Sequence, residues 1–154
     1  MSHVVPIHDS GIAGIDAAMT IMEAAFDPEF GEAWNRGQCL GILSLSDTWL
    51  SLAGEPAPAG FALARRMLDD AELLLLAVAP SARGHGIARA LIEHTAAESR
   101  RRGASRLLLE VRANNGAASL YEQAGFAAIG RRTGYYRSPN GTLHDALTLA
   151  RSLG

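Results

Sequence analysis

The sequence contains no lysine, because its fourteen basic residues (Lys and Arg together) are all arginine. This absence excludes catalysis by a lysine side chain and the lysine-containing phosphate loop of nucleotide hydrolases. An excess of one charge is also missing, since sixteen acidic residues leave a net charge of −2. The chain therefore lacks a general positive field, and we expect no direct nucleic-acid partner.

Cysteine is scarce, and Cys39 alone cannot form an internal disulfide. This favours a reducing compartment, so we expect a cytoplasmic protein in which Cys39 is a small buried hydrophobe. Apolar runs are too short for a membrane span, and residues 1–5 lack the regions of a secretion signal. The five histidines show no metal-ligand spacing, so we expect neither a membrane nor a metal partner.

Apolar residues, in contrast, are plentiful. They make up 48% of the 154 residues, and charged residues make up 19%. This balance excludes a disordered chain, and the length suits one domain that spans residues 1–154.

Hydrophobic periodicity predicts an α/β domain with a mixed sheet. Apolar residues at three- and four-residue steps predict a helix from Ile12 to Phe26, capped by Asp9 or Ser10, and a shorter helix covers Glu32 to Leu40. We expect strands at 48–53, 59–67, 72–79, 106–113, 126–136 and 142–150, a helix at 86–102, and a short helix that contains residues 117–121 and ends at Gly125. Helical crossovers imply parallel neighbours and hairpins imply antiparallel ones, so helices flank a mixed central sheet.

A strand followed by a glycine turn and a helix carries the strongest chemical signal. The apolar run Leu76-Ala77-Val78 ends before Pro80, and Arg83-Gly84-His85-Gly86 then leads into the next helix. Glycine lets a backbone approach a ligand closely, and the free amides at a helix N-terminus favour an anion. The spacing matches neither a dinucleotide fingerprint nor a P-loop. A phosphate site and an ordinary glycine turn are equally good interpretations of the spacing alone.

Three segments together resemble the GNAT N-acetyltransferase superfamily. Arg83-Gly84-His85-Gly86-Ile87-Ala88 fits its Q/R-x-x-G-x-G/A pyrophosphate loop. Downstream, Leu109-Glu110-Val111-Arg112 and Leu120-Tyr121-Glu122 are similar to segments of the RimI-type branch, which acetylates the N-terminal alanine of a small-subunit ribosomal protein. The resemblance covers residues 72–150 well, and residues 1–70 only in the order of elements. It implies a fold in which two parallel strands, 72–79 and 106–113, splay apart.

The resemblance also implies how acetyl-CoA binds. The pantetheine arm would contact the backbone of Leu76, Ala77 and Val78, and the pyrophosphate would lie on the amides of Gly84 to Arg89. Arg83 or Arg89 would add a charged contact. His85 would lie over the phosphates, or it is simply an exposed turn residue. Asn115 matches an asparagine that contacts the pantetheine arm.

The catalytic residues that the resemblance implies are Glu110 as base and Tyr121 as the proton donor to the thiolate. Glu72 is a rival base. Glu110 is otherwise a structural carboxylate paired with Arg112 or Arg131, and Tyr121 is otherwise a packing residue. From Asn115 to Tyr121 the chain is one residue shorter than the branch. One residue turns a helix by about 100°, so either the loop absorbs the difference or Glu110 and Tyr121 are not placed as in the branch. Aligning Asn114 instead restores the spacing but shortens the distance to Glu110.

The sequence says least about the acceptor substrate. Tyr135 and Tyr136 would line a slot for a peptide N-terminus, or they are ordinary strand aromatics, and Trp34 and Phe30 fall in the expected acceptor wall. We expect few acidic residues near that wall, which favours a peptide over a polyamine. We therefore expect direct transfer from acetyl-CoA to a protein α-amine. The alternatives are a small-amine acetyltransferase, acting on a polyamine, an antibiotic or an amino acid, and an acetyl-CoA-binding protein without turnover.

Overall fold

The computed structural model describes residues 5–154, so most of the segment tested for a secretion signal, Met1–Val4, lies outside it. Its strands are β1 (Ile7–Ser10), β2 (Thr48–Ala53), β3 (Gly60–Met67), β4 (Asp70–Val78), β5 (Arg106–Arg112), β6 (Ala127–Arg137) and β7 (Leu143–Ser152). Its α-helices are α1 (Ile15–Ala25), α2 (Arg36–Leu43), α3 (Ile87–Arg101) and α4 (Ala117–Gln123). Short 3-10 turns lie at Ile12–Gly14, Pro28–Phe30 and Pro80–Ala82. No helix among residues 5–154 is long and apolar enough to cross a membrane.

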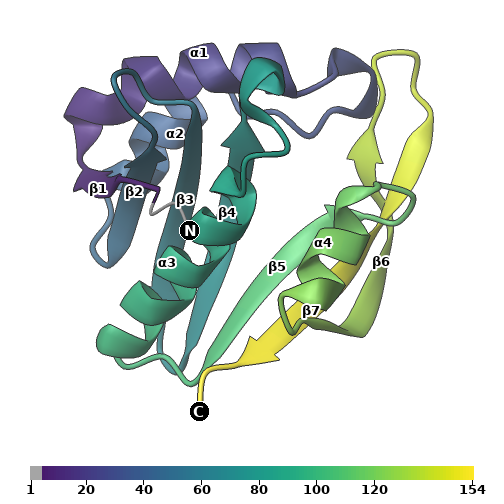
Figure 1. Cartoon of the computed structure of the whole chain (residues 1–154). Helices are drawn as coiled ribbons and strands as arrows, with labels where there is room; N and C mark the ends of the chain where they lie inside the picture. Colours follow the sequence, from purple (N-terminus) through teal and green to yellow (C-terminus); the bar gives the residue numbers. More distant parts are fainter. Residues whose placement is uncertain (1–4) are drawn as a thin grey trace.

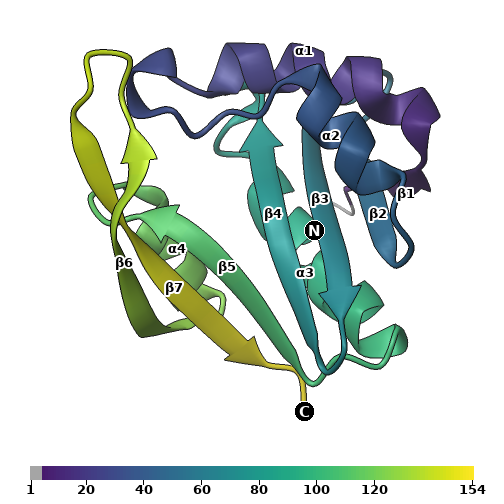
Figure 2. The same cartoon turned by 180° about the vertical axis from the view of Figure 1, so that it is seen from behind.

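The strands form one mixed sheet in the order β1-β2-β3-β4-β5-β7-β6. β4 and β5 are parallel, joined by the α3 crossover, and the other described neighbours are antiparallel. Figure 1 shows α3 and α4 on one face of this sheet, and Figure 2 shows α1 and α2 on the other. The predicted fold class, a mixed sheet flanked by helices, is confirmed.

The parallel strands separate part-way along their length. Their pairing runs from Asp70 with Arg106 to Leu73 with Leu109 and, within the described chain, extends no further. On the other side of β4, Leu63 pairs with Leu75 whereas Ala64 pairs with Leu73, so Leu74 is an extra residue, a β-bulge. A bulge bends and twists its strand. β4 therefore turns away from β5 at the bulge, and the splay expected from the sequence is confirmed (Figure 2).

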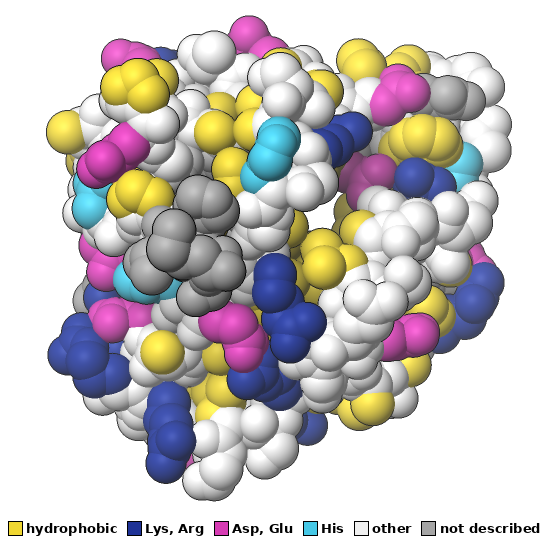
Figure 3. All heavy atoms as spheres, in the orientation of Figure 1, with side chains coloured by type: hydrophobic (Ala, Val, Ile, Leu, Met, Phe, Trp, Pro, Cys, Tyr) yellow, Lys and Arg dark blue, Asp and Glu magenta, His cyan; other side chains and the backbone are white. Residues whose placement is uncertain are grey.

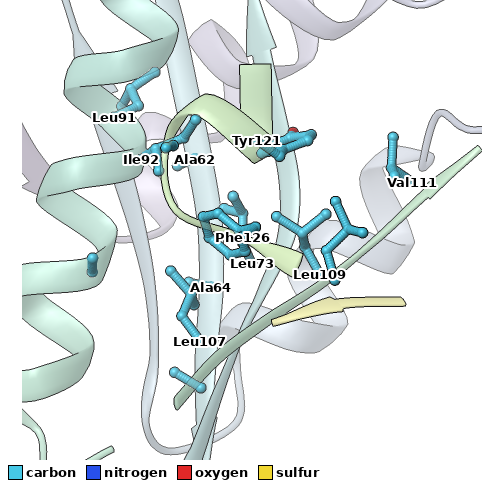
Figure 4. Packing of buried hydrophobic residues seen from close by; sticks show 14 of the residues in the cluster. Ala62, Ala64, Leu73, Leu91, Ile92, Leu107, Leu109, Val111, Tyr121 and Phe126 are labelled. Atoms are coloured by element: carbon cyan, nitrogen blue, oxygen red, sulfur yellow. The ribbon is translucent and has the colours of Figure 1, made fainter. Parts of the chain in front are cut away.

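The bulge also changes which face the β4 side chains take. Leu73 packs in the core under α3 and α4, together with Leu91, Leu107 and Tyr121 (Figure 4). Leu75 packs in the second core, under α1 and α2. Each face of the sheet thus has its own apolar core, and both cores extend to the place where β4 and β5 part.

Two helix starts differ from the sequence-based prediction. Asp9 and Ser10 do not cap the first helix, because they belong to β1, which pairs with β2. The second helix begins at Arg36 rather than Glu32, because Asn35 and Gln38 form a capping box with two 2.8 Å hydrogen bonds. The shift leaves residues 27–35 as a connecting segment, called the strap below, which runs past the end of the strand gap (Figure 1).

Candidate functional site

The space between the separated strands is a cavity of about 460 Å³, called the central cavity here. In the space-filling view it is an opening between the two halves of the molecule (Figure 3). Among the residues predicted to bind a ligand, those that line this cavity are Leu76, Ala77, Val78, Arg83, Ala88, Asn115 and Tyr121. Past Leu73 the described chain gives β4 no strand partner on this side, so its backbone edge faces the cavity.

The glycine loop borders a second pocket of about 250 Å³, which shares Val78 and Arg83 with the central cavity. Gly84 and Gly86 have φ of +82° and +78°, a region that disfavours a side chain. Gly86 precedes α3 without a side-chain cap, and no residue in the described chain accepts a hydrogen bond from the amides of Ile87–Arg89. Free amides and a helix dipole of this kind would favour an anion beside the cavity.

The two polar side chains of this loop have different surroundings. Arg83 donates to the carbonyl oxygen of Ala25 at 3.3 Å, which ties the loop to the end of α1. A ring nitrogen of His85 lies 3.0 Å from the carbonyl oxygen of Ala82, and its side chain is exposed. His85 does not line either described pocket, and its role toward a ligand stays a prediction.

Glu110 follows Leu109, the last residue of β5 that is paired with β4. Its carboxylate accepts hydrogen bonds from the Thr148 hydroxyl at 2.9 and 3.0 Å, and it pairs with Arg132 Nε at 2.9 Å. The alternative partners taken from the sequence are wrong, since Arg112 binds Glu32 and Arg131 binds Asp145. Glu110 is thus held in place by β6 and β7 at the point where the strands part.

Tyr121 lies on α4 with its side chain 8% exposed and its ring edge-on to Phe126 at 5.9 Å. Burial, together with the negative charge of Glu32, raises the pKa of its hydroxyl, which therefore stays protonated. Tyr121 and Glu110 both line a cavity of about 100 Å³, called the junction cavity, whereas Glu72 does not. Two residues from different elements, an acid and a carboxylate, thus face one space.

The segment that starts at Asn115 forms a turn before α4. The Asn115 backbone amide donates a hydrogen bond to the Arg112 carbonyl oxygen at 2.9 Å, which closes a tight turn. Its side-chain oxygen accepts from the Ala117 amide at 2.8 Å, in the first turn of α4. Tyr121 reaches the junction cavity despite the missing residue.

A fourth concavity, the acidic groove, has a volume of about 170 Å³. Three carboxylates line it, from Glu32, Glu72 and Glu110, so the expectation of few acidic residues near the acceptor wall is wrong. Its aromatic residues are Trp34, Tyr135 and Tyr136. The last of these donates a 3.4 Å hydrogen bond to the backbone carbonyl of Glu110, and burial raises the pKa of its hydroxyl. The sequence-based prediction had named both tyrosines for this region.

Comparison with known proteins relates this geometry to a family. Residues 16–126 match the family described as "Acetyltransferase (GNAT) family". The chain belongs to the GNAT acetyltransferase family. It is 43% identical over 93 residues to the [Ribosomal protein bS18]-alanine N-acetyltransferase of Escherichia coli strain K12, a match that spans 60% of this chain and 62% of that protein. The corresponding Haemophilus ducreyi protein is 33% identical over 118 residues, which cover 76% of this chain and 81% of that protein.

A solved structure of the family superposes along almost the whole chain. The crystal structure of the ribosomal-protein-S18-alanine N-acetyltransferase from Escherichia coli gives a TM-score of 0.85 at 30% identity and covers 98% of this chain and 95% of that one. The resemblance drawn from the sequence, and the GNAT fold that it implied, are confirmed.

Sequence reasoning missed Glu32, which lines the central cavity, the junction cavity and the acidic groove. It lies in the strap, where no family motif of the sequence pointed to it. Its carboxylate pairs with Arg112 Nε at 3.1 Å, and both side chains are nearly buried. A carboxylate three residues before a capping-box asparagine carries no local signal, because its partner is eighty residues away.

The remaining candidates from the sequence have structural surroundings. Asp145 accepts from Arg131 and from the Gly134 amide, each at 2.9 Å, and so holds the β6–β7 hairpin. Cys39 is 2% exposed in the core under α1, as predicted, and burial raises the pKa of its thiol. Among residues 5–154 no three His, Cys, Asp or Glu side chains are placed to hold a metal ion.

Proposed function

We propose that this protein is an acetyl-CoA-dependent N-acetyltransferase that modifies the N-terminal α-amine of a protein, with alanine as the first residue. The observation that carries the proposal is the junction cavity, where Glu110 from β5 and Tyr121 from α4 face one space at the strand split. The relatives, which are named as ribosomal-protein-S18-alanine N-acetyltransferases, support an alanine of a ribosomal protein as the acceptor. Such an acceptor would place the reaction in the cytoplasm.

The residues of the split fit an acyl-CoA. Acetyl-CoA, when bound, supplies a thioester as the acyl donor. The backbone of Leu76–Val78, with Asn115 across the central cavity, would hold its pantetheine arm. The amides of Gly84–Arg89 would hold its pyrophosphate, because they are free, sit at a helix N-terminus and include two glycines that leave room for close approach. Arg83 and Arg89 line the loop pocket and would add positive charge.

The transfer joins the amine nitrogen to the thioester carbon while the carbon–sulfur bond breaks. Glu110 takes the proton that the amine loses, and Tyr121 gives its proton to the departing thiolate. No acyl-enzyme is required, so both substrates are bound together. An α-amine with a pKa of about 7.7–8.0 is roughly one tenth neutral at pH 7, whereas a lysine amine is less than about a thousandth neutral. An α-amine therefore needs only a weak base to remove its proton.

The acidic groove supplies the acceptor site in this proposal. Its carboxylates suit the positive charge of an incoming ammonium group, and Tyr135 and Tyr136 with Trp34 offer flat surfaces for a peptide backbone. Glu72 is the weaker candidate for the base. It pairs with Arg65 at 3.3 Å, and it lies where β4 and β5 are still paired.

The test is thiol release from acetyl-CoA, with the products identified by mass spectrometry. The acceptors are peptides that differ only in a first residue of Ala, Ser, Gly or Met, an N-terminally blocked peptide with one internal lysine, spermidine and an aminoglycoside. Acetylation at the α-amine, fastest for the Ala peptide and absent from the blocked peptide, is expected. Turnover with the small amines alone would overturn the proposed acceptor.

Replacing Gly86 with alanine should weaken acetyl-CoA binding by about tenfold or more. A side chain at φ +78° costs about 1–2 kcal/mol, which the loop avoids by moving its amides away from the phosphate position. Gly103→Ala is the matched control, because Gly103 has φ +98°, equally open space and a position at the far end of α3. Calorimetric titration of both variants should show weaker binding in Gly86→Ala alone. Equal affinities would remove this loop from the binding site.

A further inference from the structure

We infer that Glu32 is a positioning residue of the transfer reaction, which aims Tyr121 through Asn115 and the first turn of α4. The inference rests on the proposed function for its chemistry, but its geometry stands alone. Glu32 Oε1 pairs with Arg112 Nε at 3.1 Å, and Glu32 Oε2 accepts from the Asn115 side-chain amide at 3.4 Å. The Glu32 carboxylate thus binds a side chain at each end of the turn between β5 and α4.

Asn115 connects the Glu32 carboxylate to the helix that carries Tyr121. Asn115 uses its side-chain nitrogen toward Glu32 and its side-chain oxygen toward the Ala117 amide at 2.8 Å. The α4 helix is short and has no cap hydrogen bond from Gly116, so Asn115 fixes its start. A carboxylate that orients Asn115 therefore orients the helix, with Tyr121 in its second turn.

The strap, which contains Glu32, is held by contacts with β5 and with the β6–β7 hairpin. The Arg112 guanidinium lies over the Phe30 ring at 3.6 Å and donates to Asn114 Oδ1 at 3.0 Å. The Phe30 ring meets His144 of the hairpin edge-on at 5.4 Å. Gly31, with φ +65°, lies so close to the Arg137 carbonyl that no side chain fits between them. The strap therefore spans from α1 to the β6–β7 hairpin, and the position of Glu32 is fixed.

Glu32 also acts on Tyr121 through its charge. Of the groups around the phenol, it is the one whose negative charge raises the Tyr121 pKa, in addition to burial. The charged and titratable side chains that line the cavities beside Tyr121 are Asp27, Glu32, Arg83, Glu110, Arg112 and Tyr136. Removing the Glu32 charge would lower the Tyr121 pKa, while burial, the larger cause, would still hold it above its usual value.

The variant Glu32→Gln keeps the shape of the side chain and removes its charge. We expect kcat to fall by about tenfold, with the acceptor KM within about twofold of the wild-type value. The matched control is Glu93→Gln, which breaks the Glu93–Arg151 pair on the outer side of α3 and should leave both unchanged. A raised acceptor KM at unchanged kcat would overturn the inference, because Glu32 would then be an acceptor-binding residue.

A double-mutant cycle separates positioning from general structural support. In the Tyr121→Phe background, Glu32→Gln should lower kcat by less than about twofold, because the group that Glu32 positions is gone. A full tenfold loss in that background would show that Glu32 does not act through Tyr121.

Hydrogen exchange gives a readout that needs no acceptor. In Glu32→Gln, but not in Glu93→Gln, amides of residues 113–121 should exchange at least about fivefold faster while β2 and β3 are unchanged. If wild type acetylates no acceptor yet exchange rises in this segment, the proposed function fails and the positioning geometry stands. Unchanged exchange in residues 113–121 would contradict the positioning itself.

Discussion

Replacing Tyr121 with phenylalanine should lower kcat by about 10²-fold or more while acetyl-CoA affinity stays the same. The substitution removes one hydroxyl, and with it the proton that the departing thiolate would receive. Loss of a positioned general acid costs typically 10²–10⁴-fold, so 10² corresponds to about 2.7 kcal/mol in the barrier. Steady-state kinetics with the Ala peptide and calorimetric titration of acetyl-CoA measure the two quantities separately.

The same variant should fold normally, which makes the result interpretable. Phenylalanine keeps the ring that packs edge-on against Phe126, and no residue of the described chain hydrogen bonds the Tyr121 hydroxyl. Thermal unfolding should therefore shift little. An unchanged kcat in a stable Tyr121→Phe protein would remove Tyr121 from the mechanism and leave it as a packing residue.

Replacing Glu110 with glutamine should reduce kcat/KM by about 10²–10³-fold at neutral pH. Glutamine can still accept the Thr148 hydroxyl hydrogen bond, so the side chain should keep its place. The lost Arg132 pair is worth little stability, because the Arg132 side chain is 61% exposed. What the variant loses is the acceptor for the amine proton, which kinetics with the Ala peptide would measure.

Glu72→Gln is the comparison that decides between the two candidate bases. It removes a carboxylate from the same acidic groove, but at the paired end of the strands and outside the junction cavity. Its effect on kcat should stay within about threefold. A large loss in Glu72→Gln with a near-normal Glu110→Gln would transfer the role of base to Glu72.

The fold was predictable where local sequence patterns and the packing agree. The strand 48–53 was predicted with the bounds that the structure gives, because four of its six residues are apolar and turns flank it. The loop from Arg83 to Gly86 was predictable because its backbone needs positive φ at two positions, and the sequence has glycine at both. Glu110 and Tyr121 could likewise be named as candidates from the sequence, because each lies in a short family motif.

Other features depend on contacts between distant segments. β1 has four residues and exists because it pairs with β2, so Asp9 and Ser10 looked like helix caps. The Leu74 bulge is invisible in an unbroken run of leucines, although it decides where the strands part. Glu32 could not be identified from the sequence, because its partner Arg112 is eighty residues away and because α2 begins later than predicted.

The most direct test of the account is hydrogen exchange of the wild-type protein with and without acetyl-CoA. If the cofactor arm lies in the strand split, exchange should slow in residues 74–78, at the amides of 84–89 and in the turn 113–117. The outer strands β1 and β2 should not change. Binding that slows exchange elsewhere and leaves residues 74–78 and 84–89 unprotected, or no binding at all, would contradict the assignment of this split as the acetyl-CoA site.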